Sequence, residues 1–284
     1  MRSVPGHITD LTPFSSVDGP GNRFIVFLQG CNFDCIACHN PHTIAECDSC
    51  GECVAVCPEG ALSVEPREGL VVLDAAICTH CDICVEACPY DSTPLAGHEP
   101  VLGVLEQIRA AAPFISGVTV SGGEPTLQPN FLVELLSTLK GEPSLSHLTT
   151  LVDSNGSAPR EVWDRLHPVL DGAMIDLKAL DDDVHRRLTG SSNGSVLESI
   201  EYLNATDRLH EVRMLMIPGR NDDAGMVARS AEWLAALGGV RVRLIPFRRH
   251  GVRPAFAGID EPSEQQMELH RAILAAAGLE VVGA

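Results

Sequence analysis

Basic residues, aromatic residues and long apolar runs are all scarce in this sequence of 284 residues. It carries 20 Lys and Arg residues against 38 Asp and Glu, which gives a formal net charge of −18 at pH 7. Contacts to phosphate groups need clustered basic side chains, so we expect no nucleic acid partner. Aromatic residues make up 4% of the chain, and no basic stripe carries interleaved aromatics. We interpret the acidity as a solvated surface.

No apolar stretch reaches the roughly 18 residues that a membrane-spanning helix needs, so no membrane span is expected. The segment Met1–Asp10 also lacks the apolar run of a secretory signal. These absences predict a cytoplasmic protein. Thiols stay reduced in that compartment, so its cysteines are expected to bind metal before they form disulfides.

Cysteine is absent from the long C-terminal part of the chain, because all eleven cysteines lie between Cys31 and Cys88. This segregation predicts an inserted metal-binding module over residues 45–94, ending at a turn-rich Asp-Ser-Thr-Pro segment. Residues 1–44 and 95–284 would then form the main domain.

Short β-rich runs alternate with helical patterns outside this module. The expected strands are Arg23–Gln29, Val118–Ser121, Leu148–Val152, Ala173–Leu177, Val212–Met216 and Val240–Ile245. The expected helices are Val101–Ala112, Asn130–Lys140, Arg160–Leu166, Val196–Asn204, Asp223–Leu237 and Glu264–Ala277. Such alternation predicts parallel strands with crossover helices, in six units and not eight. The expected fold is α/β, a partial (β/α)6 TIM-like barrel with an inserted ferredoxin-like domain.

One cysteine spacing occurs twice within the module. Each run reads Cys-x2-Cys-x2-Cys-x3-Cys-Pro, which is typical of bacterial ferredoxins, where the fourth cysteine reaches the other cluster. One [4Fe–4S] cluster is thus predicted on Cys47, Cys50, Cys53 and Cys88, and another on Cys57, Cys78, Cys81 and Cys84. Structural zinc needs only four ligands in two pairs and leaves the remaining cysteines and the prolines unexplained.

Three cysteines remain, Cys31, Cys35 and Cys38, here called the N-terminal trio. Three thiolates on a cube of four irons leave one iron without a protein ligand. An open coordination position is typical of a catalytic metal site. The trio therefore predicts a third, catalytic cluster.

Polar residues follow several of the predicted strands. Gly122, Gly123 and Glu124 come after the second strand, and the segment 153–156 (DSNG) comes after the third. Glycines allow a ligand to approach the backbone, and a carboxylate can accept hydrogen bonds from an ammonium group. The C-terminal ends of strands are where (β/α) barrels place their active sites.

The spacing C-x3-C-x2-C followed by GGE resembles the radical S-adenosylmethionine (SAM) superfamily. The wider series DGPG-x-RF, QGC-x3-C-x2-CHN, SGGEP, D-[ST]-N-G and M-x-DLK resembles the activating enzymes of glycyl radical enzymes, such as pyruvate formate-lyase activating enzyme. It covers essentially the whole chain, and the two-cluster insert is most similar to the YjjW-type activases. The resemblance implies that SAM binds the open iron and is reductively cleaved. The resulting 5′-deoxyadenosyl radical would abstract a hydrogen from a glycine of the partner enzyme.

The same resemblance implies residue roles. Gly122, Gly123 and Glu124 would bind the amino group of SAM, and Lys178 and Arg213 would help to hold SAM. A monovalent-cation site would use Asp153, Ser154 (a threonine in the family), Met174 and Asp176. Residues near the incoming glycine loop would be Asp18, Gly19, His39 and Asn40. Flavodoxin or ferredoxin would be the reductant.

Two positions depart from the family pattern, and several alternatives stay open. Ala37 stands where an aromatic residue usually precedes the third cysteine, and arginines follow Pro246-Phe247 where relatives have a histidine, so His250 is a possible replacement. The insert clusters could relay electrons or be structural. The chain could also be a radical SAM enzyme acting on a small molecule, or a non-enzymatic electron carrier.

Overall fold

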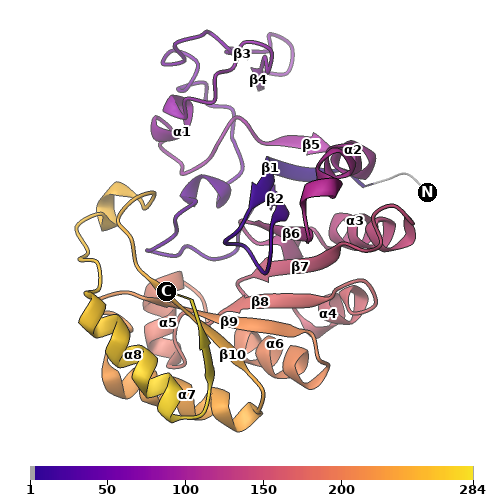
Figure 1. The fold of residues 1–284 in the computed structure, drawn as a ribbon. Coiled ribbons are helices and arrows are strands. Elements are labelled where there is room, and N and C mark those ends of the chain that lie inside the picture. Colours follow the sequence, from indigo (N-terminus) through magenta and orange to yellow (C-terminus); the bar gives the residue numbers. More distant parts are fainter. Residues whose placement is uncertain (1–3, 284) are drawn as a thin grey trace.

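A nine-stranded, largely parallel sheet forms the centre of the computed structural model, which describes residues 4–283. Its strand order is β11-β10-β9-β8-β7-β6-β2-β1-β5 (Figure 1). The bounds of the strands are β1 Gly6–Ser15, β2 Arg23–Leu28, β5 Gly97–Glu99, β6 Gly117–Gly122, β7 Thr149–Ser154, β8 Gly172–Asp176, β9 Leu209–Met216, β10 Arg241–Pro246 and β11 Glu280–Val282. The fold is therefore mixed α/β, as predicted.

The six predicted strand–helix units are confirmed. β2 and β6–β10 lie next to one another in chain order, and all neighbouring pairs among them are parallel. The connecting helices are α2 Val101–Ala111, α3 Pro129–Gly141, α4 Arg160–Leu166, α6 Gly194–Ala205, α7 Ala224–Leu237 and α8 Glu264–Ala276. Because each strand enters from the same direction, their C-terminal ends and the loops that follow share one edge of the sheet.

Strands β1, β5 and β11 and helix α5 Asp182–Thr189 were not predicted from the sequence. β1 contains Asp10 and Pro13, which are rare in strands, but it pairs antiparallel with β2 and meets β5 only over its first three residues. α5 is short and strongly charged. It did carry end signals, because the Asp181 side chain accepts from the Val184 amide and Gly190 is left-handed at its C-terminus.

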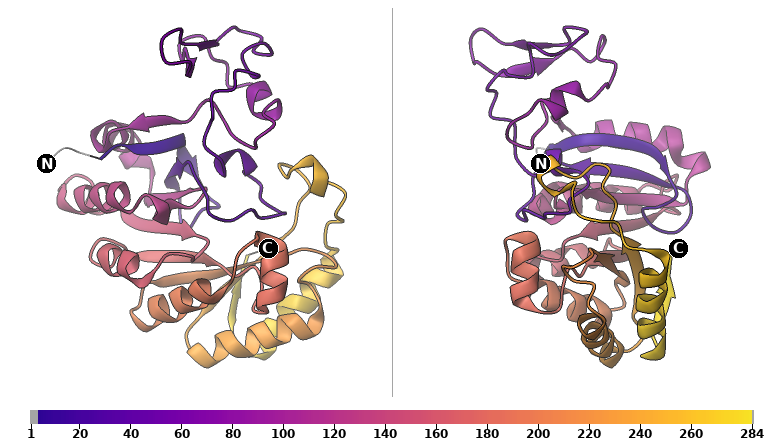
Figure 2. Two further views of the ribbon diagram at one scale, coloured as in Figure 1. Left: turned by 180° about the vertical axis from the view of Figure 1, so that it is seen from behind. Right: turned by 90° about the vertical axis from the view of Figure 1, so that its left-hand side faces the viewer.

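The cysteine-rich segment lies off the edge of the sheet formed by β1 and β5, as Figures 1 and 2 show. Its elements are β3 Leu62–Val64 and β4 Val71–Leu73, which pair antiparallel, and the four-residue helix α1 Ile83–Glu86. Cys53, Leu62 and Cys84 form a small buried cluster apart from the main core.

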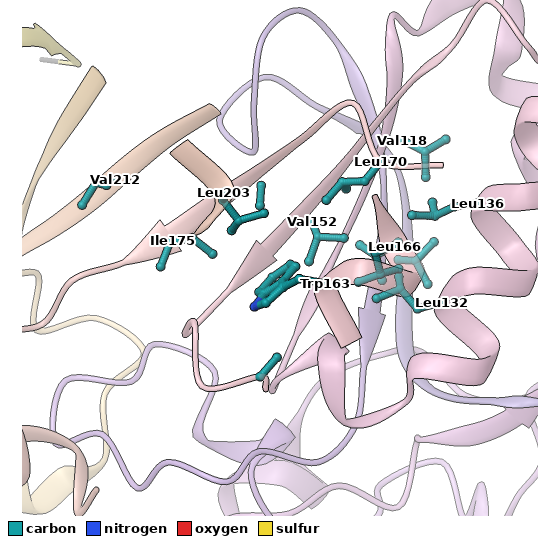
Figure 3. Close-up of a cluster of buried hydrophobic side chains, with 14 of the residues drawn as sticks. Val118, Leu132, Leu136, Val152, Trp163, Leu166, Leu170, Ile175, Leu203 and Val212 are labelled. Atoms are coloured by element: carbon teal, nitrogen blue, oxygen red, sulfur yellow. The ribbon is translucent and has the colours of Figure 1, made fainter. Parts of the chain in front are cut away.

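The main core lies between the sheet and its helices. Figure 3 shows Trp163 of α4 among buried aliphatic side chains from α3, β7 and neighbouring elements. The indole Nε1 of Trp163 donates to Ser199 Oγ on α6 at 2.8 Å, and Ser199 Oγ donates to the Gly156 carbonyl at 2.7 Å. One hydroxyl thus joins two helices to the loop after β7. No helix within residues 4–283 has the length and apolar character to cross a bilayer.

We expect Ser199→Ala to lower the free energy of unfolding by about 1–3 kcal/mol, because it leaves the buried Trp163 indole N–H without an acceptor. Urea unfolding of the iron-free chain measures this. Ser146→Ala, at an exposed serine, is the matched control and should stay within about 0.5 kcal/mol of the parent. Equal midpoints for Ser199→Ala and the control would contradict this account.

Candidate functional site

The N-terminal trio lies on a loop between β2 and the 3-10 turn Pro41–Thr43, at the C-terminal edge of the sheet. The loop has no helix or strand of its own. Backbone amides of Asp34 and Ile36 donate to the carbonyls of Thr189 and Leu188 at the end of α5, at 2.8 and 2.9 Å. The Cys31 amide donates to the Ile44 carbonyl at 3.0 Å. The missed helix α5 therefore holds the loop in place.

The thiols of the trio are largely enclosed. Burial raises the pKa of Cys31 to about 11 and that of Cys35 to about 12. Burial also raises the pKa of Cys38. Lys178 lies close enough to Cys35 that its charge opposes this rise. Without a metal these groups are thiols at neutral pH, so binding a cluster must release their protons.

The glycines after β6 allow that loop to pack against the backbone before the trio. A Cβ on Gly122, which has φ +119, would lie 2.2 Å from the backbone of Leu28, and a Cβ on Gly123 would lie 2.2 Å from the Gly30 carbonyl oxygen. The Glu124 amide donates to that carbonyl at 2.8 Å. The predicted GGE segment and the cysteine loop are thus brought together by close backbone contact.

The carboxylate of Glu124 is fully buried and joins two strand-end loops. Its Oε1 accepts from the Thr126 amide at 3.0 Å and from Ser154 Oγ at 2.9 Å. Its Oε2 accepts from the Asn155 amide at 2.7 Å. Burial raises its pKa, and these donors lower it. The Ser154 hydroxyl is engaged here, and it also accepts from the Gly156 amide at 3.0 Å.

Buried charges line the inner side of β7, β8 and β9. Arg213 Nη1 donates to Asp153 Oδ2 at 2.9 Å, its Nε donates to Glu211 Oε1 at 2.9 Å, and its Nη2 lies 2.9 Å from Met174 Sδ. Burial raises the pKa of Asp153 to about 6, although Arg213 opposes the rise. Arg243 donates to the same Glu211 oxygen at 2.9 Å.

Asp176 and Lys178 form a second ion pair beside this group, at 2.8 Å. Burial alone would lower the pKa of Lys178, but the Asp176 carboxylate raises it. The charge of Lys178 acts on both Cys35 and Cys38. Of the predicted SAM and cation residues, Glu124, Asp176 and Lys178 therefore lie near enough to the trio for their charges to act on its thiols.

The four predicted partner residues lie in two places. Asp18 and Gly19 precede β2, at the opposite end of the strand from the trio, where the Asp18 carbonyl accepts from Thr119 Oγ1 at 2.7 Å. His39 and Asn40 follow the trio, and His39 Nε2 lies 3.1 Å from the Arg248 carbonyl oxygen. His250 lies near enough to disfavour a charge on His39, whose pKa burial lowers.

Two cavities lie in the cysteine-rich segment, and each borders one predicted cysteine set. The first is lined by Cys57, Cys78, Cys81 and Cys84 among others. The second is lined by Cys47, Cys50, Cys53 and Cys88, and Cys84 borders it as well. Within residues 4–283, no group of three or more His, Cys, Asp or Glu side chains converges tightly enough for a single metal ion.

The two cysteine runs adopt the same backbone conformation at equivalent positions. Left-handed residues occur before the second cysteine, after it, and three residues after the fourth cysteine. The pairs are Ser49 and His80, Gly51 and Asp82, and Gly60 and Asp91. Such φ values cost energy for residues other than glycine, so their repetition indicates loops with a specific shape.

Some contacts of the site could not be predicted from motifs. The Asn155 side chain, part of the predicted DSNG segment, donates to Asn32 Oδ1 at 3.0 Å and lies 3.9 Å from Cys31 Sγ. Arg253, whose surroundings carry no motif, contacts the trio loop. Ala37 is buried in an apolar cluster that includes Phe247, the residue after β10.

Comparison with known proteins identifies the class. A sequence profile of the radical SAM superfamily matches residues 25–231, so the chain belongs to that superfamily, as the trio and the GGE segment predicted. Radical SAM enzymes use a [4Fe–4S] cluster and SAM, which they cleave to a 5′-deoxyadenosyl radical.

Its curated relatives are activating enzymes of glycyl radical enzymes. The isethionate sulfite-lyase activating enzyme of Desulfovibrio desulfuricans is 31% identical over 94% of this chain and 91% of its own length. The 4-hydroxyphenylacetate decarboxylase activating enzyme of Clostridioides difficile strain CD196 is 33% identical over 88% of this chain and 84% of its own.

Two solved structures share the fold. A domain of pyruvate-formate lyase-activating enzyme from Bacteroides vulgatus has a TM-score of 0.52 and 28% identity, covering 60% of this chain and 99% of that domain. QueE from Escherichia coli has a TM-score of 0.54 over 98% of this chain and 92% of its own, at 13% identity, and so supports the fold alone.

We expect Glu124→Gln to destabilise the iron-free chain by about 1–3 kcal/mol. In the parent both carboxylate oxygens accept hydrogen bonds, whereas the NH2 group of glutamine would face one set of these donors and cannot accept from them. Chemical unfolding measures this. Glu106→Gln, at an exposed helical position, is the control. A Glu124→Gln protein as stable as the control would show that the carboxylate does not join the two loops.

Proposed function

We propose that this protein activates a glycyl radical enzyme. The observation that carries the proposal is the N-terminal trio, enclosed beside the loops after β6, β7 and β8 in a chain whose curated relatives are such activases. A [4Fe–4S] cluster on the trio would supply the electron that breaks the sulfonium C–S bond of SAM, giving methionine and a 5′-deoxyadenosyl radical that takes one Cα hydrogen from a partner's glycine.

The donor set of the trio suits such a cluster. Cys31, Cys35 and Cys38 supply three thiolates and leave a fourth coordination position for SAM. Lys178 compensates the negative charge that the thiolates bring, because its charge already acts on two of the three sulfurs. Enclosure of the thiols keeps water from the site where a radical would form.

We assign the SAM amino group to the segment Gly122, Gly123 and Glu124. The buried Glu124 carboxylate has most of its hydrogen-bonding capacity engaged, which suits a role in fixing the shape of this loop. Lys178 and Arg213 would hold the rest of SAM. The cation site would be formed by Asp153 and Asp176, with Ser154 and Met174. A cation between the two carboxylates would compensate their negative charge together with the guanidinium of Arg213.

We further propose that residues 45–94 form a ferredoxin-like insert with two [4Fe–4S] clusters, in a partial (β/α)6 barrel made of residues 1–44 and 95–284. The lining of the two cavities supports this, because one gathers Cys57, Cys78, Cys81 and Cys84 and the other gathers Cys47, Cys50, Cys53 and Cys88, which are the two predicted ligand sets. Cys84 borders both cavities, so two clusters there would lie close enough to exchange electrons. Ten acidic residues and one arginine lie between 45 and 94, and such negative charge favours low potentials.

The partners follow from the chemistry. A one-electron donor of low potential is needed, for which flavodoxin or ferredoxin in the cytoplasm is the candidate. The glycine loop of the partner would lie near His39 and Asn40 beside the trio, and it would reach Asp18 and Gly19 by extending toward the start of β2, where the charge of Asp18 acts on Asp153. Glycine suits this loop because it has no side chain to obstruct entry.

We expect Cys35→Ala to lose 5′-deoxyadenosine formation down to the uncatalysed background, and to keep about 8 of about 12 iron atoms per chain, since only one of three four-iron clusters is lost. Mass spectrometry of anaerobic reactions with dithionite and SAM measures the product. Cys81→Ser is the matched control and should retain cleavage, because dithionite does not need the insert. Cleavage that survives Cys35→Ala would contradict the assignment of the catalytic cluster.

We expect electron paramagnetic resonance (EPR) to show a glycyl doublet on a large candidate partner after incubation with the reduced protein and SAM. A partner variant with Ala at the radical glycine should give no doublet. Turnover of a metabolite with no radical on any partner would instead indicate a small-molecule enzyme. SAM left intact would indicate an electron carrier.

A further inference from the structure

Arg253 joins three segments that are distant in the sequence. It lies on the loop between β10 and α8, just before the 3-10 turn Pro254–Phe256. Its Nη2 donates to the Cys35 carbonyl at 2.9 Å, and its Nη1 lies 2.6 Å from Asp34 Oδ1 and 3.4 Å from Asp91 Oδ2. One guanidinium thus contacts the trio loop and the end of the cysteine-rich insert.

The surroundings of Arg253 hold it in this position. Its side chain is 16% exposed, and its guanidinium carbon lies 5.3 Å from the centre of the Phe256 ring. The loop that carries it approaches the trio loop again at Gly251, where a Cβ would lie 2.9 Å from the His39 carbonyl oxygen. Its Nε is buried and has no hydrogen-bond partner among residues 4–283.

Asp91 occupies a position where the first cysteine run has a glycine. Asp91 and Gly60 both follow a Cys-Pro pair by two residues, and both are left-handed, with φ values of 51° and 62°. Glycine adopts this conformation without steric cost, whereas an aspartate does so less readily. The Asp91 side chain, which has no counterpart at Gly60 in the first run, is the one that contacts Arg253.

We propose that Arg253 is a positioning residue that locks the N-terminal trio loop to the insert through Cys35 and Asp91, and that its charge stabilises the reduced form of the cluster on the trio. Reduction adds a negative charge to a cluster, so a guanidinium bound to the carbonyl of a ligand cysteine favours the reduced state. The positioning part stands on the contacts alone, and the redox part rests on the proposed function.

The positioning part is tested by hydrogen–deuterium exchange on the iron-free full chain. We expect Arg253→Gln to speed exchange of the Asp34 and Ile36 amides about tenfold, since losing a charge-assisted hydrogen bond is worth a factor of this order. Arg249→Gln is the matched control, because Arg249 lies on the same loop and its side chain pairs with Asp260 and donates to the Ile259 carbonyl, away from the trio loop. Exchange of these amides that is equal in the two variants would overturn the positioning role.

The contact with the insert is tested by Asp91→Asn and Asp91→Gly. Both substitutions remove the carboxylate charge, and both new residues tolerate a left-handed backbone. We expect both variants to raise the rate of proteolysis in residues 89–96 several-fold, with Asp74→Asn, elsewhere in the insert, as the control. Proteolysis at the parental rate in both Asp91 variants would overturn the link to the insert.

The redox part is tested by titrating the EPR signal that changes when SAM is added, which reports only a cluster with an open iron. We expect its midpoint potential to fall in Arg253→Gln and to be restored in Arg253→Lys, which keeps the charge but not the planar fork. An unchanged potential in Arg253→Gln would overturn the redox role. If the unsubstituted protein gives no SAM-responsive signal, the proposed function is wrong instead, and the exchange experiment still decides the positioning role.

Discussion

The trio of cysteines lies on a loop without helix or strand, so restraints on its shape come largely from other elements. Carbonyls at the end of α5 accept hydrogen bonds from two backbone amides of the loop, and the Ile44 carbonyl, after the loop, accepts from a third. Arg253 donates to the Cys35 carbonyl. The loop after β6 packs against the backbone just before it, at glycines where no Cβ fits. A site held in this way depends on the ends of several strands being adjacent, which the parallel sheet provides.

Buried charge follows the same edge of the sheet. Asp153, Asp176, Lys178 and Arg213 compensate one another in pairs, and Glu211 shares one carboxylate oxygen between two arginines. Breaking such a pair leaves a charge buried without compensation, which is far more costly than losing a surface pair. The arrangement therefore keeps charged groups positioned inside the fold.

Local patterns made much of this site predictable. Cysteine spacing is a local property, so the doubled run and the trio could be read from the chain, and the two cavities border the predicted sets. The six strand–helix units were likewise strongly periodic. β1 could not be found because Asp10 and Pro13 are poor strand residues, and its pairing with β2 and, over three residues, with β5 is not visible in the sequence.

The features of the site that could not be predicted from the sequence depend on contacts between distant segments. Arg253 forms ion pairs with Asp34 and Asp91, which are more than 150 residues away in the chain. Neither sequence spacing nor residue type predicts these contacts. The hydrogen bond from the Ser154 hydroxyl to the buried Glu124 carboxylate is similar, because no motif indicates it. Side-chain direction is decided by packing and is not visible in a motif.

The central claim is that a cluster held by only three cysteines leaves one iron free for SAM. Electron–nuclear double resonance on the reduced protein, with nitrogen-15 in the amino group of SAM, tests it directly. The account predicts a hyperfine coupling between that nitrogen and the cluster, and its loss in Cys35→Ala. A well-formed reduced cluster on the trio with no coupling to labelled SAM would contradict it.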